Sequence, residues 1–330
     1  ELALSRPAPK TFGALGRATH LTALSSLRLC GALRGALGHG LADGRLECLL
    51  GRGAPFLSTL RSLSLDACEL GGGGLAPLRD APLLRLQSLS LSCNGLTDTD
   101  AGDLAAAPLP VLTRLDLSGN AISALGLEFI LEAEWARGLR SLSLALCPIG
   151  NCGVAALGDA PALTALADLE LGFTGITDAA LWYFQGAPWV PALTRLDLRG
   201  NPRLGRNPFF WEAFCIQPLP ALRTLDVSAS APLHPSAASL LAAAVWLPQL
   251  EVLRVQGWDA LSLTSRLATG KRPLPALEAS PALAAVVRQT GYANRKEMLA
   301  WRARWRASRP LKLRTRLMDP KSSLTVNSVT

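Results

Sequence analysis

Few residues in this chain have the type and spacing that catalysis or metal binding requires. The three histidines, His20, His39 and His234, are far apart, and none has a Cys or acidic residue at the spacing typical of metal ligands. The glycine run at 71–74 lacks the Lys-Ser or Lys-Thr pair that ends a phosphate-binding loop, so we interpret it as a connecting loop. The sequence predicts no catalytic residues, no metal, no cofactor and no small-molecule substrate, and we expect that the protein is not an enzyme.

The seven cysteines also lack a pattern typical of chemistry. Their number is odd, their spacing is irregular and no secretory apolar segment precedes them, which favours a reducing compartment over a disulfide framework. Cys147 and Cys152 are five residues apart, but we expect a structural role for them, as for Cys68. The aromatic run Phe209-Phe210-Trp211 is interpreted as helix packing rather than as a ligand-binding motif.

Charged residues do recur at a regular spacing, inside a leucine motif that repeats along the chain. Nine segments read L-x-x-L-x-[LV], and only Val227 and Val255 replace leucine at the three apolar positions. The segments begin at Leu24, Leu60, Leu86, Leu112, Leu139, Leu166, Leu193, Leu222 and Leu250, at intervals of 36, 26, 26, 27, 27, 27, 29 and 28 residues. The charged residues between the leucines are Arg114, Asp116, Asp168, Glu170, Arg195, Asp197, Asp226 and Arg254. Because side chains alternate along a strand, we expect the leucines to point inward and these residues outward.

Further markers keep the same register and define one repeating unit. Eight residues after the first leucine stand Asn94, Asn120 and Asn201, with Cys68 and Cys147 as substitutes and Thr174 and Ser230 as weaker replacements. A buried Asn at this position can bond the backbone of the turn and form a ladder with its neighbours. Helical patterns follow, as at 124–133 and 179–187, so each unit is predicted to be a strand, a turn and a helix. The long first interval contains either an insertion or a degenerate unit, for which 46–50 is the candidate.

These repeats resemble the ribonuclease-inhibitor-like and cysteine-containing classes of leucine-rich repeat, over about residues 24–258. The resemblance implies an α/β fold: a right-handed leucine-rich-repeat solenoid, or horseshoe, with parallel strands on the concave face and helices on the convex face. We predict an N-terminal cap or extension at 1–23, a solenoid of about nine repeats at 24–278, and a helical cap with a basic C-terminal tail at 279–330. The family consists mainly of protein-binding platforms, so the resemblance implies a protein partner without identifying it.

The residues between the leucines are expected to form the binding surface on the concave face. In the earlier repeats they are small, which would let a partner approach closely: Ser62, Ser64, Ser88, Ser90, Ser141 and Ser143. The acidic row that could hold a basic segment consists of Asp116, Glu170, Asp197 and Asp226. Alternatively these are ordinary solvated residues, with Arg114/Asp116 and Arg195/Asp197 neutralising one another. If the row binds a partner, changing Asp197 and Asp226 to Lys should weaken that binding without unfolding the repeats.

The basic charge of the chain is concentrated in its C-terminal part. Residues 288–330 contain 11 Lys and Arg against Glu297 and Asp319, a net charge of +9, whereas the rest of the chain is close to neutral. A helix is predicted at 294–308, with an anchor of aromatic and basic residues: Trp301, Arg302, Arg304, Trp305 and Arg306. Three interpretations remain open: a capping helix or a tail folded over the acidic row, an anchor to an acidic protein or anionic lipid, and RNA binding through phosphate contacts and stacking.

The N-terminal segment bears on the compartment. Residues 2–42 contain no acidic residue but several basic ones, and the chain begins at Glu1, which suits the remainder of an organellar import segment. No stretch approaches the ~18–20 uninterrupted apolar residues that span a bilayer, so we expect a soluble or peripheral protein. These features favour a non-enzymatic scaffold, an accessory subunit of a large multiprotein complex, predicted to be mitochondrial. The alternatives are a ribosome-associated or RNA-contacting subunit and a cytoplasmic or ciliary adaptor.

Overall fold

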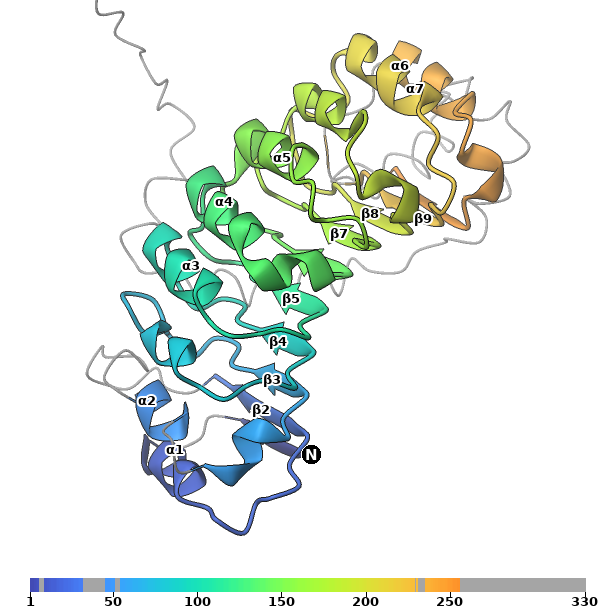
Figure 1. The fold of residues 1–330 in the computed structure, drawn as a ribbon. Helices are drawn as coiled ribbons and strands as arrows, with labels where there is room; N and C mark the ends of the chain where they lie inside the picture. Colours follow the sequence, from blue (N-terminus) through green and yellow to red (C-terminus); the bar gives the residue numbers. More distant parts are fainter. Residues whose placement is uncertain (6–8, 32–44, 51–53, 229, 231–234, 256–330) are drawn as a thin grey trace, which may run out of the picture. The chain divides into compact units, whose positions relative to one another are not determined.

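The structure of the chain is a computed structural model that describes residues 1–5, 9–31, 45–50, 54–228, 230 and 235–255. The chain divides into two units, Glu1–Ala293 and Asn294–Thr330, and every described residue belongs to the first unit. The predicted cap and tail at 279–330 therefore lie outside the described residues. The first unit contains all the strands and helices that are drawn in colour in Figure 1.

Ten short strands form one parallel sheet, and their order in the sheet is their order in the chain (Figure 1). The middle leucine of each strand pairs with the middle leucine of the next, as Leu89 does with Leu115. This confirms that the predicted leucine motifs stack in one continuous row. The strands are β1 (Leu2–Ser5), β2 (Ser26–Cys30), β3 (Ser62–Ser64), β4 (Ser88–Ser90), β5 (Arg114–Asp116), β6 (Ser141–Ser143), β7 (Asp168–Glu170), β8 (Arg195–Asp197), β9 (Thr224–Asp226) and β10 (Val252–Arg254).

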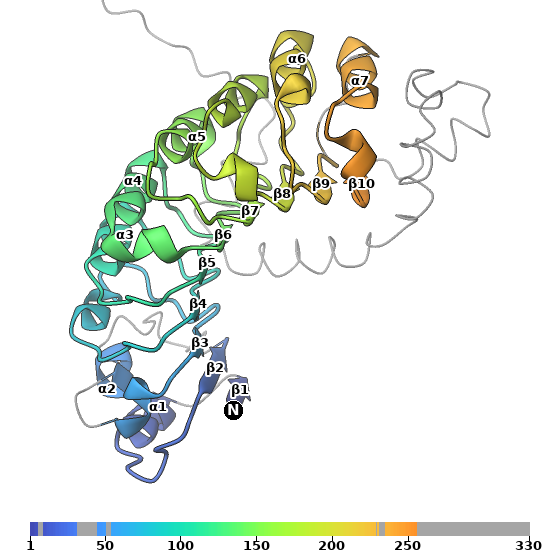
Figure 2. The same ribbon diagram turned by 45° about the vertical axis from the view of Figure 1, so that its right-hand side comes forward.

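Short helices connect the strands and lie together on one side of the sheet (Figure 2). The α-helices are α1 (Pro9–Gly16), α2 (Arg45–Leu50), α3 (Asp98–Ala105), α4 (Ala124–Glu132), α5 (Gly150–Gly158), α6 (Pro208–Ile216) and α7 (Pro235–Ala242). The 3-10 helices are η1 (Pro55–Ser58), η2 (Ala76–Arg79), η3 (Glu134–Gly138), η4 (Asp178–Phe184), η5 (Val190–Ala192) and η6 (Leu247–Gln249). The helix predicted at 124–133 is confirmed, whereas the one at 179–187 is the 3-10 helix η4. None of the described helices is long and apolar enough to cross a membrane.

The core lies between the sheet and the helices and runs from repeat to repeat. The motif leucines point into it: Leu86, Leu89 and Leu91 of one repeat are each at most 1% exposed. Burying a leucine side chain stabilises the fold by about 1.5–3 kcal/mol, so each repeat gains most of its stability against its neighbours. Because the strands alternate, the residues on either side of the middle leucine face away from the helices.

The N-terminal region differs from the sequence prediction in two respects. Residues 1–23 contain β1, which extends the sheet by pairing Leu2 with Leu27 and Leu4 with Leu29. The leucine motif does not predict this strand, because only the last two apolar positions of the motif are present there. Residues 46–50, the candidate for a degenerate unit, belong to helix α2, and β2 pairs directly with β3. The 36-residue interval is therefore an insertion.

The predicted asparagine ladder is present and buried. Asn120 accepts hydrogen bonds from the backbone N–H groups of Asn94 (2.9 Å) and Leu96 (3.1 Å). Its amide also donates to the carbonyl oxygens of Leu91 (3.0 Å) and Leu117 (2.7 Å). One amide thus links two consecutive turns, and Asn94 and Asn201 bond in the same way in their own repeats.

Cysteine and threonine replace asparagine in the ladder with fewer bonds. The Cys68 thiol donates to the carbonyl of Leu29 and the Cys147 thiol donates to that of Leu117, both at 3.1 Å. The Thr174 hydroxyl donates to the carbonyl of Leu171 (2.8 Å). The structural role predicted for Cys68 and Cys147 is confirmed, and the ladder fixes the loop that follows each strand.

The residue before the ladder position turns the chain with a left-handed backbone. Its φ angle is positive in six consecutive repeats, including +55° at Ala67 and +59° at Phe173. Glycine takes this conformation without strain, and it stands there in two repeats, as Gly119 and Gly200. At Gly200 a side chain would also collide with the Phe173 ring. This shared turn brings each strand into the same register with the next.

Candidate functional site

The candidate site is the strand face, by which we mean the sheet surface that points away from the helices. It is lined by three columns of side chains, each running across the strands. The first column consists of Ser26, Ser62, Ser88, Arg114, Ser141, Asp168, Arg195, Thr224 and Val252. The second column consists of Arg28, Ser64, Ser90, Asp116, Ser143, Glu170, Asp197, Asp226 and Arg254. The third column follows the strands and includes Asp66, Ser92, Ser118, Arg199 and Ser228.

The half of this face over β3 to β6 is rich in serine, and we call it the serine-rich half. Its charged centre is Asp66, which the sequence analysis did not select. The Asp66 carboxylate accepts hydrogen bonds from the hydroxyls of Ser64 (2.7 Å), Ser92 (2.9 Å) and Ser90. It also accepts one from the backbone N–H of Ser92 (3.1 Å). These bonds hold the carboxylate in place, and within the described residues it makes no ion pair.

Asp116 lies two strands further along the serine-rich half. Its carboxylate accepts a hydrogen bond from the backbone N–H of Ser118 (2.9 Å). Burial raises the pKa of Asp116 above its ordinary value, and the negative charges of Asp66 and Glu170 raise it further, against the lowering effect of Ser118. The predicted neutralisation by Arg114 does not occur among the described residues, where Arg114 is exposed and forms no ion pair with Asp116.

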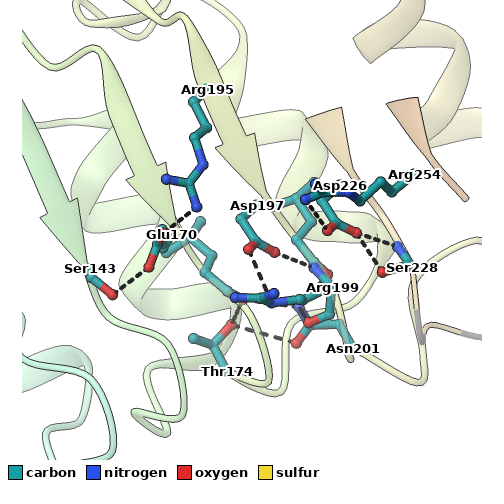
Figure 3. A network of polar contacts seen from close by, with 12 residues as sticks. Ser143, Glu170, Thr174, Arg195, Asp197, Arg199, Asn201, Asp226, Ser228 and Arg254 are labelled. Carbon is teal, nitrogen blue, oxygen red and sulfur yellow. Dashed lines mark hydrogen bonds and ion pairs between the residues drawn. The ribbon is translucent and has the colours of Figure 1, made fainter. Parts of the chain in front are cut away.

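The half of the face over β7 to β10 is dominated by ion pairs, and we call it the ionic half (Figure 3). The Arg195 guanidinium pairs with Glu170 and lies 3.4 Å from Asp168. Glu170 also accepts a hydrogen bond from the hydroxyl of Ser143 (2.9 Å), which joins the two halves. The alternative in which Arg195 pairs with Asp197 is not what the structure shows, because Arg195 forms its ion pairs with the acidic residues of the preceding strand.

Asp197 is only 3% exposed and is not an open surface charge. Its carboxylate accepts from the side-chain Nε and the backbone N–H of Arg199, both at 3.0 Å (Figure 3). Burial raises the pKa of Asp197, the Arg199 charge lowers it, and the nearby Asp226 carboxylate raises it again. The net result is a raised pKa, so the folded protein holds this charge against a desolvation cost.

Asp226 is equally buried, at 3% exposure. Its carboxylate accepts from the backbone N–H of Ser228 (2.9 Å) and from the Ser228 hydroxyl, and it lies 3.5 Å from the Arg254 guanidinium. A lysine at Asp197 or Asp226 would place an ammonium group in a site built for a carboxylate. The expectation that both residues can be reversed to Lys without unfolding the repeats is therefore not supported, and we now expect destabilisation.

The structure thus brings most of the predicted site residues into one surface but changes their roles. Arg195 pairs with Asp168 and Glu170, and Arg254 pairs with Asp226. Asp197 pairs with Arg199, whereas Arg114 and Asp116 form no ion pair within the described residues. Two residues of the strand face were not predicted, Asp66 and Arg199. Each lies two positions after a residue predicted to point outward, Ser64 or Asp197, so extending the alternation by one step would have predicted them. The predicted tail anchor of Trp301, Arg302, Arg304, Trp305 and Arg306 lies outside the described residues.

The acidic and cysteine side chains of the described residues bear on possible metal or thiol chemistry. The described residues contain no group of three or more His, Cys, Asp or Glu side chains that could hold a metal ion. Burial raises the pKa of the Cys147 and Cys215 thiols to about 12, so neither is a thiolate near neutral pH. What the described strand face presents is a polar surface whose side chains are held by hydrogen bonds and ion pairs.

Comparison with known proteins supports the class that the fold defines. The family model described as Leucine Rich repeat matches residues 86–105, 109–131 and 138–158, which are three consecutive repeats. Together with the ten-stranded parallel sheet, these matches identify the chain as a leucine-rich-repeat protein. Proteins of this fold typically serve as non-catalytic, protein-binding scaffolds.

No curated protein matches the sequence. Among solved structures, a chain in the crystal structure of the Rad7 and Elc1 complex in yeast matches with a TM-score of 0.41 and 17% sequence identity. The match covers 74% of this chain and 71% of that chain. Because this likeness is low, the family assignment rests on the repeats and on the sheet.

Proposed function

We propose that this leucine-rich-repeat protein is a non-enzymatic scaffold subunit of a larger protein assembly, and that the serine-rich half of its strand face is the contact surface. The observation that carries the proposal is the run of short serine side chains on three of the four strands from β3 to β6. Serine projects little from a sheet, so the backbone or a helix of a partner can approach closely.

The two halves of the strand face differ in what they offer a partner. In the ionic half, Arg195, Arg199 and Arg254 already neutralise the neighbouring carboxylates, and breaking these pairs would cost part of any binding energy. In the serine-rich half, Asp66 and Asp116 make no ion pair within the described residues, and Arg114 is exposed. This half can exchange water for a partner's polar groups without first losing internal ion pairs.

We also propose that charged residues of the ionic half contact the partner at the edge of the contact surface. The side chains of Arg195 and Arg254 are each 42% exposed, so both can add to binding at the edge of the contact surface. Charges at such an edge change the association rate and the salt dependence more than the affinity.

The proposal is tested by blocking the serine-rich half without changing the core. In the double variant Ser62→Arg/Ser88→Arg, two bulky side chains would stand in the first column. The control is Ser58→Arg, at an exposed position in η1. We expect the protein purified from its source cells to lose its co-purifying subunits in the double variant and to keep them in the control. Unchanged composition in the folded double variant would exclude this surface.

A ribonucleoprotein subunit is the second candidate, and it is favoured by the net charge of +9 over residues 288–330. Nuclease treatment before purification separates the candidates, since protein–protein contacts survive it and RNA-bridged ones do not. An adaptor in the cytoplasm or cilium and a mitochondrial location both remain proposals, which imaging of the tagged protein would distinguish.

A further inference from the structure

We propose a second contact surface on the helix side of the repeats, formed by Trp182 and Phe209 with Arg203 and Arg206 of the loop that precedes α6. We call it the aromatic patch. The geometry points to an acidic peptide segment with an apolar side chain as its occupant. This surface is separate from the strand face, and its identification does not depend on the proposed function.

Trp182 differs from the other tryptophans that the structure describes. Trp135, Trp189, Trp211 and Trp246 are at most 5% exposed, and each indole N–H donates to an oxygen of a neighbouring repeat. Trp182 is 46% exposed. Its ring stacks on Phe209 with centroids 6.2 Å apart and planes 11° apart, although Phe209 remains 60% exposed. Two large aromatic rings thus meet at the surface. The interpretation of Phe209-Phe210-Trp211 as helix packing holds for Phe210 and Trp211 but not for the exposed Phe209.

Buried aromatic packing supports the patch from beneath. Buried Phe184, from the same 3-10 helix as Trp182, packs edge-on against Trp189 and against Phe214 of α6, at centroid distances of 5.1 and 5.6 Å. This buried contact fixes η4 relative to α6, the two elements that present the exposed rings. A surface already held in its binding geometry loses little entropy when a partner docks.

A buried carboxylate fixes the backbone of Arg206 next to the first turn of α6. Asp178, the first residue of η4, is 4% exposed. It accepts hydrogen bonds from the backbone N–H groups of Gly205 (2.6 Å), Arg206 (2.9 Å) and Asn207 (2.8 Å), and from the indole of Trp211 (2.8 Å). The Asp178 carboxylate thus bonds the backbone of Arg206, and within the described residues it forms no ion pair with the Arg206 side chain.

The charge around the patch favours an acidic partner. Arg203 and Arg206 are exposed and form no ion pair within the described residues, and Arg206 precedes Phe209 by three residues at the N-terminal end of α6. The positive end of the helix dipole adds to this potential. The exposed acid Glu212 stands one helical turn beyond Phe209, so the positive charge is confined to the loop side of the rings.

Composition favours a protein partner over a nucleic acid. Tryptophan and arginine are among the residues most enriched where the binding energy of protein interfaces is concentrated. Nucleic-acid binding through the backbone instead needs several phosphate contacts, and two arginines would supply few of them. A carboxylate beside Arg206 and an apolar side chain against Phe209 would use both features of the patch.

The test is a selection from a phage-displayed library of random peptides, about a dozen residues long, against the full chain, with counter-selection against the double variant Phe209→Ala/Arg206→Glu. We expect the surviving peptides to be acidic and to carry an apolar or aromatic residue. Synthetic copies, measured by fluorescence anisotropy, should bind at least about tenfold more weakly to Trp182→Ala, to Phe209→Ala and to Arg203→Glu/Arg206→Glu. The controls Leu125→Ala and Arg137→Glu, at exposed positions elsewhere on the helix side, should bind as the wild type does.

Several outcomes would overturn the inference. Failure to select any peptide that depends on Phe209 and Arg206 would remove the patch as a peptide site. Selection of basic peptides would contradict the predicted charge. Binding of a labelled oligothymidine that is lost in Phe209→Ala would assign the patch to nucleic acid. Concentration-dependent self-association lost in the same variant would assign it to a second copy of the chain.

Discussion

The asparagine ladder gives the sharpest test of how this fold is held together. In the variant Asn120→Ala, the buried amide that links two turns is removed while the leucine core remains intact. The side chain is only 4% exposed, so water cannot easily replace it. The prediction is therefore a large loss of stability from one polar residue in an otherwise apolar core.

The magnitude follows from the groups that lose their partners. The N–H groups of Asn94 and Leu96 and the carbonyl of Leu91 each lose the bond to Asn120. The carbonyl of Leu117 keeps one partner, because the Cys147 thiol also donates to it. An unsatisfied buried backbone group costs about 1–3 kcal/mol, and such costs are not fully additive. We expect a loss of about 3–5 kcal/mol in the free energy of unfolding.

Cysteine at the same position should be less harmful. Cys68 and Cys147 occupy equivalent positions and still donate to a carbonyl of the preceding repeat. In Asn120→Cys the thiol would still donate to the carbonyl of Leu91. The N–H groups of Asn94 and Leu96 would lose the amide oxygen that accepts from them. The expected loss is about half of that in Asn120→Ala. The control Asn207→Ala removes an exposed helix cap that accepts from Phe209 N–H and should cost about 1 kcal/mol.

Equilibrium denaturation in urea, followed by tryptophan fluorescence and circular dichroism, would measure these differences. Trp135, Trp189, Trp211 and Trp246 are buried and report on the packing of their repeats. If Asn120→Ala is no less stable than Asn207→Ala, the ladder contributes little and our argument from buried backbone groups is wrong. If Asn120→Ala and Asn120→Cys lose the same free energy of unfolding, the hydrogen bond donated by the thiol does not stabilise the fold.

Three further predictions address the turn, the buried acid and the thiols. Ala67→Gly should raise the free energy of unfolding, measured in urea, by about 0.5–1 kcal/mol. Glycine relieves the backbone strain at φ +55°, and this gain exceeds the extra conformational entropy that glycine gives the unfolded chain. A loss of stability in this variant would refute the prediction. The pKa of Asp197 is raised in the folded state, so its stabilising contribution is complete below its ordinary pKa and lost as the pH rises through the raised value. The wild type should therefore lose more stability than Asp197→Asn between about pH 4 and pH 8, and parallel profiles would contradict this. The exposed Cys152 should react with Ellman's reagent much faster than the buried Cys147, and equal rates would show that the repeat opens readily.

The fold could be predicted because its two periodic signals come from burial. Leucine recurs wherever a strand points inward, and a buried turn needs a side chain with both donor and acceptor, so Asn94 and Asn120 mark it in the sequence. β1 escaped prediction because it carries only the last two of the three apolar positions. The left-handed turn also escaped, since Ala67 and Phe173 do not favour positive φ and tertiary packing imposes it on them.

The pairing within the strand face could not be predicted to the same extent. Strand alternation identifies which residues face outward, but an ion pair depends on which neighbour a long side chain reaches. Arg195 reaches back across the sheet to Glu170, and Asp197 pairs with Arg199, which lies beyond the end of its strand. Assigning ion pairs between residues that are close in the sequence therefore gave Asp197, and not Glu170, as the partner of Arg195.

The columns of the strand face differ in accessibility for a physical reason. Residues of the third column bond back to the second: Ser228 donates to Asp226, and Arg199 donates to Asp197. Ser64 likewise donates to Asp66 and is itself buried. The first column has no such cover, and all of its members on β2 to β10 remain at least partly exposed. A partner would therefore contact the first column and the partly exposed members of the second, such as Arg254. The buried members of the second column support the surface: Ser64, Ser143, Asp197 and Asp226. Substitutions in the first column should change binding with little effect on stability, and substitutions at Asp197 or Asp226 should change stability before they change binding.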